Sequence, residues 1–181
     1  YVEYVSQKAI GKSSRSNPVT YIKAYDEIRK LFSSQRESKI RGYKPKHFSF
    51  NVEGGRCESC KGEGVNTIEM QFMPDVRLTC ESCNGTRFKK EILEINISGK
   101  NISDILNLTV DDAIIFFNAL EEIKISEKLS ILQKVGLGYI KLGQSSSTLS
   151  GGEAQRVKLA YFLSMKTCLL YTSPSPRDGL L

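Results

Sequence analysis

The chain has 181 residues, of which 40% are hydrophobic and 25% charged, a balance that indicates a globular domain rather than a disordered segment. No apolar run approaches the roughly 18–20 residues that a membrane-spanning helix needs, and no basic-then-apolar leader is present. The composition therefore argues against a transmembrane or a secreted protein. The sequence opens in mid-pattern with Tyr1-Val2-Glu3-Tyr4 and no initiator methionine, and we expect a fragment.

The net charge of +6 is concentrated in the first part of the chain. Residues 1–50 hold 11 basic and 4 acidic side chains, whereas the rest of the chain is close to neutral. A basic face of this kind indicates a polyanionic partner such as a nucleic acid. A solvated basic surface without a partner is the alternative that charge alone leaves open.

The first predicted element is a helix that begins at Asn17-Pro18, where asparagine is a good N-cap and proline a good first helical residue. Its apolar side chains recur at helical spacing, and Gly42 and Pro45 follow it. The stripe that we expect to be buried comprises Tyr21, Tyr25, Ile28 and Phe32. The next segment, Phe48-Ser49-Phe50-Asn51-Val52, alternates in the manner of a short strand.

A β-hairpin is predicted between residues 68 and 80. Ile68, Met70 and Phe72 alternate with polar residues, Met73-Pro74-Asp75 forms a turn, and Val76, Leu78 and Cys80 alternate again. A similar alternation of Leu93, Ile95 and Ile97, closed by Ser98-Gly99, suggests a third strand.

The rest of the chain is predicted to be mainly helical. Residues 101–135 have helical periodicity, with a capping box from Thr109 to Asp112 in which aspartate replaces the usual glutamate. A loop rich in glycine and serine spans 136–152, and a last helix runs from about 152 to 165. The side chains expected on the buried side of that helix are Ala154, Val157, Ala160 and Leu163.

The strongest chemical signal is a pair of cysteine knuckles. Cys57-x-x-Cys60 and Cys80-x-x-Cys83 are separated by nineteen residues that hold the predicted hairpin. Two residues between cysteines allow both sulfurs to reach one ion, and four thiolates suit a closed structural Zn²⁺ site. Gly62, Gly64 and Gly85 follow the knuckles, where positive φ lets amide N–H groups point at sulfur. Two disulfides or an iron–sulfur cluster are the alternatives.

A second signal lies at a loop-to-helix junction and reads Leu149-Ser150-Gly151-Gly152-Glu153-Ala154-Gln155-Arg156. Ser150 can cap the helix, and the two glycines let backbone N–H groups approach an anion at the positive end of the helix dipole. The octapeptide resembles the signature motif of ATP-binding-cassette ATPases. Neither a Gly-x-x-x-x-Gly-Lys-[Ser/Thr] loop nor an apolar strand ending in Asp-Glu occurs, so the chain holds half of an ATP site and should not hydrolyse ATP alone.

Together these strings resemble the UvrA family, the damage-recognition ATPases of bacterial nucleotide excision repair, and in particular their second nucleotide-binding module. The resemblance covers residues 1–164. The strings that carry it are Gln7-x-x-Ile10-Gly11 with Arg15-Ser16-Asn17-Pro18-x-Thr20-Tyr21, Phe48 to Val52, Gly54 to Gly64, Met73-Pro74-Asp75-Val76, Val135 to Gln144, and Thr148 to Arg156.

The resemblance implies how the site residues are used. Gln7 would lie near Mg²⁺ and the γ-phosphate of ATP, while Ser150, Gly151, Gly152 and Gln155 would face ATP that an opposing module holds. It also implies double-stranded DNA as the partner, bound at damage without sequence specificity, together with a UvrA dimer, UvrB and a bacterial cytoplasmic location with no membrane contact. Basic and small polar residues near the first knuckle can approach phosphates, and the candidates are Lys8, Lys12, Arg15, Ser16, Asn17, Arg56 and Lys61.

The expected fold class is α+β: a partial ATP-binding-cassette module whose helical signature subdomain carries an inserted zinc-binding hairpin. The expected segments are 1–52 (basic, around the glutamine loop), 53–99 (zinc module), 100–148 (helical remainder), 149–165 (signature motif and helix) and 166–181, a tail that looks artefactual. Two alternatives stay open, a DnaJ-type zinc module, since Cys57-x-x-Cys60-x-Gly62-x-Gly64 occurs there too, and another ATP-binding-cassette ATPase.

Overall fold

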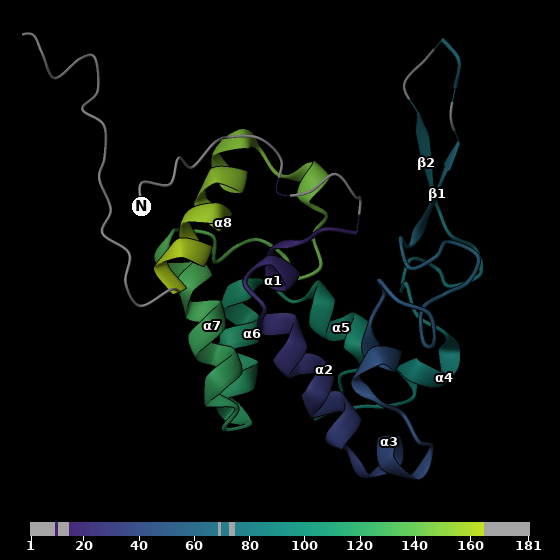
Figure 1. Ribbon diagram of the computed structural model, residues 1–181, viewed down its shortest axis with the longest axis horizontal. Helices are drawn as coiled ribbons and strands as arrows, with labels where there is room; N and C mark the ends of the chain where they lie inside the picture. Colours follow the sequence, from purple (N-terminus) through teal and green to yellow (C-terminus); the bar gives the residue numbers. More distant parts are fainter. Residues whose placement is uncertain (1–9, 11–14, 69, 73–74, 165–181) are drawn as a thin grey trace, which may run out of the picture.

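A helical body from which one β-hairpin projects makes up the computed structural model, which describes residues 10, 15–68, 70–72 and 75–164 (Figure 1). None of the helices in these ranges has the length and apolar character to cross a bilayer. The elements, in order, are α1 (Pro18–Tyr21), α2 (Ala24–Ser34), α3 (Arg36–Ile40), the 3₁₀ turn η1 (Pro45–Phe48), β1 (Val65–Ile68), β2 (Val76–Thr79), α4 (Lys90–Leu93), α5 (Ile102–Asn107), α6 (Val110–Ala119), α7 (Ile123–Lys134), the 3₁₀ turn η2 (Ser146–Thr148) and α8 (Gly151–Ser164).

The first helix begins as predicted but is shorter than expected. The side chain of Asn17 accepts a hydrogen bond from the N–H of Thr20 at 2.9 Å, and Pro18 is the first helical residue. The expectation of one continuous helix is wrong, because Lys23 adopts a left-handed conformation with φ of 57° and separates α1 from α2. This break reorients the chain so that both Val19 and Tyr25 are buried.

The predicted strand at Phe48–Val52 is also wrong. Phe48 closes the turn η1, and Phe48, Ser49 and Phe50 are all buried in succession, whereas a strand with one solvent face would bury every second residue. The hydroxyl of Tyr25 donates to the carbonyl of Phe48 at 2.7 Å, so this backbone is held by a side chain of α2 and not by a neighbouring strand.

The predicted third strand at Leu93–Ile97 is wrong for a related reason. Leu93 ends the short helix α4, and Ile97 pairs only with Lys100 in a tight turn through Ser98-Gly99. Ile95 and Ile97 are nevertheless buried in the main core. The apolar alternation was therefore a signal of burial and not of sheet formation.

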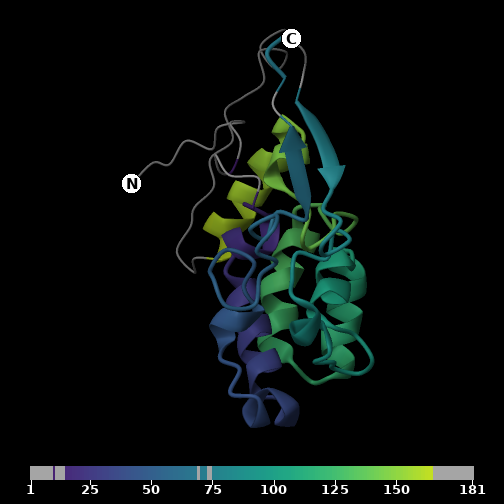
Figure 2. The same ribbon diagram turned by 90° about the vertical axis from the view of Figure 1, so that its right-hand side faces the viewer.

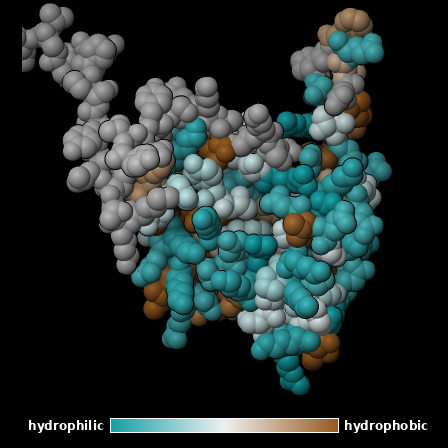
Figure 3. All heavy atoms as spheres, in the orientation of Figure 1, coloured by the Kyte–Doolittle hydropathy of each residue, from teal (hydrophilic) through white to brown (hydrophobic). Residues whose placement is uncertain are grey.

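A hairpin between the knuckles is confirmed, but its first strand lies earlier than predicted, because β1 ends at Ile68, where the predicted alternation of Ile68, Met70 and Phe72 begins. Strands β1 and β2 pair antiparallel in a register that runs from Val65 opposite Thr79 to Ile68 opposite Val76. Seven of the eight strand residues are exposed, and Figure 1 shows the hairpin projecting from the helical body, whereas in the turned view of Figure 2 it is seen in front of part of α8. Its projecting end carries apolar side chains in Figure 3, and Phe72 is 96% exposed. The hairpin thus has no core of its own and depends on what holds its base.

The helices after residue 100 follow the prediction. Helices α6 and α7 pack against each other, and α7 also contacts α2 and α8. Thr109 caps α6 by accepting from the N–H of Asp112 at 3.1 Å, although the Asp112 carboxylate takes the Thr109 hydroxyl and not the backbone N–H that completes a capping box. On α8, the expected side chains Ala154, Val157 and Ala160 are buried, but the expectation for Leu163 is wrong, because this residue in the last turn of the helix is exposed.

Helix α5 offers a test of local stability. Asn101 accepts from the N–H groups of Ser103 and Asp104, both at 2.9 Å. We expect Asn101→Ala to lower the free energy of unfolding in urea by about 1 kcal/mol, because these amides lose their acceptor. The control is Asn118→Ala, an exposed asparagine within α6, which should change stability far less. Equal losses in the two variants would contradict the capping role.

Candidate metal centre and signature helix

The two cysteine knuckles share a backbone conformation that brings their sulfurs together. In each knuckle the first, second and fourth residues after the second cysteine have positive φ: Lys61, Gly62 and Gly64 in one, and Asn84, Gly85 and Arg87 in the other. A Cβ on Gly62 would lie 2.0 Å from the carbonyl oxygen of Phe50, so only glycine fits there. The Gly64 N–H approaches the Cys60 sulfur to 3.2 Å, as the sequence predicted.

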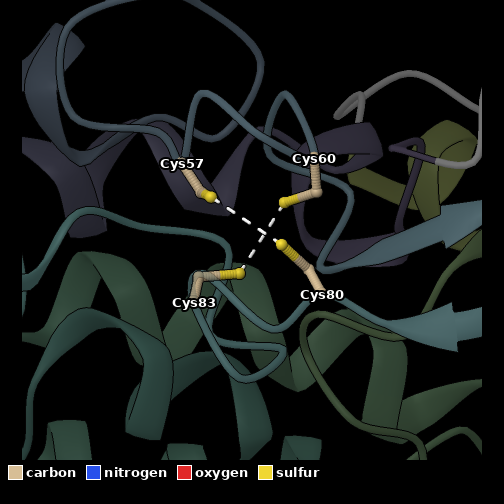
Figure 4. A group of neighbouring side chains, drawn as sticks. All are labelled: Cys57, Cys60, Cys80 and Cys83. Carbon is tan, nitrogen blue, oxygen red and sulfur yellow. Dashed lines mark hydrogen bonds between the residues drawn. The ribbon is translucent and has the colours of Figure 1, made fainter.

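The four sulfurs converge on one point (Figure 4). All lie within 4.8 Å of one another, with 4.0 Å between Cys57 and Cys80 and 3.7 Å between Cys60 and Cys83. A tetrahedral zinc site with bonds of about 2.3 Å has sulfurs about 3.8 Å apart, so the cluster fits a metal ion. The two-disulfide alternative is wrong, because a disulfide needs about 2.05 Å between sulfurs and all four cysteines are free.

Backbone amides donate to the buried sulfurs and oppose the effect of burial, which raises the pKa values of the thiols. Burial raises the pKa of the Cys80 thiol, but N–H groups of Cys83 and Ser82 donate to its sulfur and lower that pKa to about 6. Burial raises the pKa of Cys83 to about 12, although the N–H of Arg87 also donates to that sulfur. The arrangement has the second layer of donors that a thiolate metal centre requires.

The start of α8 is held by a reciprocal cap. The Ser150 hydroxyl accepts from the N–H of Glu153 at 3.3 Å, and the Ser150 N–H donates to the Glu153 carboxylate at 2.7 Å. The hydroxyl of Tyr139 donates to the other oxygen of that carboxylate, which lowers the pKa of Glu153. Gly151 and Gly152 are exposed, so the first turn of α8 is open to an anion.

The predicted DNA-contacting residues are only partly brought together. Lys8 and Lys12 lie outside the described residues, as does the predicted ATP contact Gln7. A guanidinium nitrogen of Arg15 lies 3.5 Å from the carbonyl oxygen of Lys61, which places Arg15 beside the first knuckle. The carbonyl of Ser16 accepts from the N–H of Ser146 at 2.7 Å, and this bond joins the basic segment to the turn that leads into α8.

Two of the predicted contact residues have internal partners. Asn17 is 1% exposed and its side chain caps α1, so it orients its neighbours from within the fold. Arg56 donates to the carbonyl of Asn51 and forms an ion pair with Glu53, both at 3.2 Å. Arg15 and Lys61 therefore remain the better candidates among the basic residues that the structure describes.

Sequence reasoning missed two residues that the site uses. Tyr139 was quoted only as part of a matching string, and its bond to Glu153 depends on the path of the loop before η2. Arg87 was not singled out. A signal for it existed, because the first knuckle continues with glycines at positions 62 and 64 whereas the second continues with Gly85 and then Arg87.

Comparisons with known proteins support the resemblance that the sequence motifs indicate. No family model matches the chain. UvrABC system protein A from Aquifex aeolicus is 56% identical over 178 residues, and its counterpart from Clostridium perfringens is 54% identical over 178 residues. Each alignment covers 97% of this chain, more than residues 1–164, and 19% of the relative. The crystal structure of UvrA2 from Deinococcus radiodurans superposes with a TM-score of 0.84 at 51% identity, over 88% of this chain and 19% of that one.

The fold and the site define an α+β module in which a helical body with a capped Ser-Gly-Gly helix start carries a four-cysteine hairpin insert. The chain belongs to the UvrA family and spans about a fifth of the length of the relatives that it matches. The DnaJ-type alternative gains no support from these matches.

Proposed function

We propose that this chain serves damage recognition in nucleotide excision repair, as the signature-subdomain segment of the second nucleotide-binding module of a UvrA protein. One observation carries the proposal. The Ser16–Ser146 backbone bond joins the basic segment beside the first knuckle to the turn before α8. This bond connects the segment to which we assign DNA phosphates with the helix start to which we assign ATP phosphates.

The DNA-facing part of the proposal rests on the first knuckle and on Arg15 to Asn17. Arg15 and Lys61 supply positive charge there, and Ser16 lies between Arg15 and the buried cap Asn17. The predicted contacts Lys8, Lys12 and Arg56 would extend the same basic surface. Contacts of this kind hold the DNA backbone without reading bases, which suits a protein that must recognise damage in any sequence.

The ATP-facing part of the proposal rests on α8. Ser150, Gly151 and Gly152 present a capped, exposed helix start to the γ-phosphate of an ATP molecule held with Mg²⁺ by an opposing module. Gln155, one turn further along α8, and Gln7 are the other predicted ATP contacts. Because the chain has no phosphate-binding loop or Asp-Glu strand, we infer that it completes an ATP site and does not form one alone.

The metal in this proposal is Zn²⁺ bound by Cys57, Cys60, Cys80 and Cys83. Four protein ligands close the site, so the ion stabilises the fold and takes no part in a reaction. Bound zinc would fix the base of the hairpin, which has no core of its own. The remaining parts of the proposal, a UvrA dimer, transfer of the lesion to UvrB and a cytoplasmic location, follow from the family.

A salt titration tests the DNA-facing part. Affinity for duplex DNA should fall with salt at a slope near −0.9 for each phosphate contacted. We expect the double variant Arg15→Ala/Lys61→Ala to reduce that slope in magnitude by about 1–2. Fluorescence anisotropy on two unrelated duplexes measures it, and both duplexes should weaken alike because backbone contacts carry no base information.

The matched control is Lys39→Ala, which removes one positive charge from the exposed side of α3, at the end of the body opposite the hairpin (Figure 1). This variant should leave the slope unchanged. A double variant with the wild-type slope, or a control that changes it equally, would mean that the basic segment is only a solvated face.

A further inference from the structure

The loop that follows α7 is fixed in place on both sides of Tyr139. The carbonyl of Gly138 accepts from the N–H of Asp111 at 3.0 Å. The carbonyl of Ile140 accepts from the N–H of Val110 at 2.9 Å. A Cβ on Gly138 would lie 2.3 Å from the carboxylate oxygens of Asp111, so the loop meets the start of α6 as closely as glycine allows. The backbone of Tyr139 therefore has little freedom to move.

The ring of Tyr139 contributes little to the core. Its neighbours Leu137 and Ile140 are buried, whereas Tyr139 itself is 58% exposed. A tyrosine stabilises a protein mainly by burying its ring, and an exposed ring gains little in this way. The contact that this side chain does make is polar, because its hydroxyl donates to the carboxylate of Glu153 at 2.5 Å.

Glu153 connects that hydroxyl to the start of α8. One oxygen of its carboxylate accepts from Tyr139, and the other accepts from the N–H of Ser150 at 2.7 Å. The Ser150 hydroxyl accepts in turn from the N–H of Glu153. The bonds from Tyr139 and Ser150 hold the pKa of Glu153 below its usual range, so the carboxylate stays charged and keeps both donors.

Helix α8 is attached to the same loop one turn further along. A guanidinium nitrogen of Arg156 donates to the carbonyl of Gly136 at 3.4 Å. Glu153 and Arg156 are three residues apart, so they lie on one side of the helix. The Arg156 contact holds the body of α8, and the Tyr139 contact holds its first turn.

The first turn of α8 needs such a constraint because it is exposed and rich in glycine. Ser150, Gly151 and Gly152 are all exposed, and glycine loses more conformational freedom on ordering than any other residue. Backbone donors bind a phosphate best when they are oriented toward it beforehand, since ordering them on binding costs free energy. A contact that orders this turn before ATP arrives therefore favours turnover.

We propose that Tyr139 is a positioning residue for the ATP site that α8 completes, where its hydroxyl acts through Glu153 to hold Ser150 and the two glycines in the orientation that meets the γ-phosphate. The proposal rests on the proposed function and adds to it the residue that sets the geometry of the helix start. Tyr139 touches neither ATP nor Mg²⁺. Because the opposing module holds ATP, the effect of Tyr139 falls on turnover and not on ATP capture.

The test uses Aquifex aeolicus UvrABC system protein A that carries this segment in place of its own counterpart, to which the segment is 56% identical. Tyr139→Phe removes the hydroxyl and keeps the ring. We expect kcat for ATP to fall about 10-fold, the lower end of what a hydrogen bond to a charged group contributes, while KM for ATP stays within about 2-fold. Steady-state kinetics measure both.

A double-mutant cycle shows whether Tyr139 acts through Glu153. Glu153→Ala removes the carboxylate that Tyr139 and Ser150 both bind, and it should lower kcat at least as much as Tyr139→Phe does. Tyr139→Phe should then cause no further loss when it is added to Glu153→Ala. A general loss of stability would instead lower kcat in both backgrounds alike.

Hydrogen exchange measures the positioning itself, independently of turnover. In Tyr139→Phe, peptides that cover residues 149–156 should exchange faster than in the unmutated chimera, because the N–H of Ser150 loses a fixed acceptor. Peptides from α6 and α7 should exchange at the unmutated rate. This measurement keeps the proposal testable if Glu153→Ala does not fold.

The control is Tyr161→Phe. It removes the same hydroxyl from a tyrosine of α8 itself, about two turns beyond Glu153, whose ring packs against that of Tyr21. Both kcat and the exchange of residues 149–156 should equal those of the unmutated chimera.

Four results would overturn the proposal. They are an unchanged kcat in Tyr139→Phe, a KM that rises as much as kcat falls, equal losses of kcat in both backgrounds of the cycle, and unchanged exchange of residues 149–156. The second would make Tyr139 an ATP contact. A chimera in which Ser150→Arg turns over ATP normally is a different failure, since it removes the proposed ATP site and not the bond between Tyr139 and Glu153.

Discussion

Cys80→Ala is expected to abolish tight zinc binding and to unfold the hairpin while leaving most of the helical body intact. Cys80 is fully buried in the cluster, and its loss leaves three thiols that cannot close a tetrahedral site. Structural zinc sites supply roughly 10–16 kcal/mol of apparent binding free energy, whereas an isolated two-stranded hairpin is marginal in water. Metal analysis and limited proteolysis of residues 53–99 measure the two effects.

The control for this variant is Cys168→Ala, which removes the one cysteine outside the two pairs. It should retain one zinc ion per chain and the wild-type proteolysis pattern. If wild-type protein contains zinc and Cys80→Ala contains as much, the ion is bound elsewhere. If neither contains zinc, the cluster holds another metal or none.

Ser150→Arg is expected to lower ATP turnover by at least about 100-fold, the usual loss when a group that meets transition-state charge is disabled. The assay uses Aquifex aeolicus UvrABC system protein A with this segment in place of its own counterpart, to which it is 56% identical. Ser150 is exposed, and an arginine there would fill the space that we assign to the γ-phosphate.

Ser150→Ala is the matched control. It removes the hydroxyl that caps α8 by accepting from the N–H of Glu153, but it adds no bulk. It should lower stability by about 1 kcal/mol and turnover much less than the arginine variant does. A chimera with Ser150→Arg that turns over ATP at the rate of the unmutated chimera would contradict the assignment of α8 to an ATP site. Equal losses of ATP turnover in both variants would show that turnover depends on the Ser150 cap and not on the open space beside it.

The parts of the fold that the sequence predicts well are those fixed by local chemistry. The Asn17-Pro18 cap, the hairpin between the knuckles and the helices after residue 100 each depend on residues close together in the chain. The errors arise where distant residues decide. Lys23 breaks a helix so that Val19 and Tyr25 can both be buried, and the carbonyl of Phe48 takes its partner from α2. In the segment from Phe48 to Val52, apolar residues at alternate positions therefore indicate burial but do not indicate a strand.

The same division holds for the candidate site. Spacing alone was sufficient to predict that four cysteines meet, because two residues between ligands fix each knuckle locally. It could not predict that Tyr139 holds Glu153, that Asn17 is buried or that Arg87 lies on Phe50. Each of these contacts joins elements whose relative placement follows from the packing of the core.

The contact between α1 and α8 also determines the order in which the protein can assemble during synthesis. The rings of Tyr21 and Tyr161 lie 5.2 Å apart, and the Ser16–Ser146 bond closes the same side of the body. A ribosome must therefore translate about 140 further residues before the first helix gains its cover. The knuckles, only 27 residues from first to last cysteine, can capture their ion long before. We therefore expect the base of the hairpin to form first in the nascent chain and the helical body last.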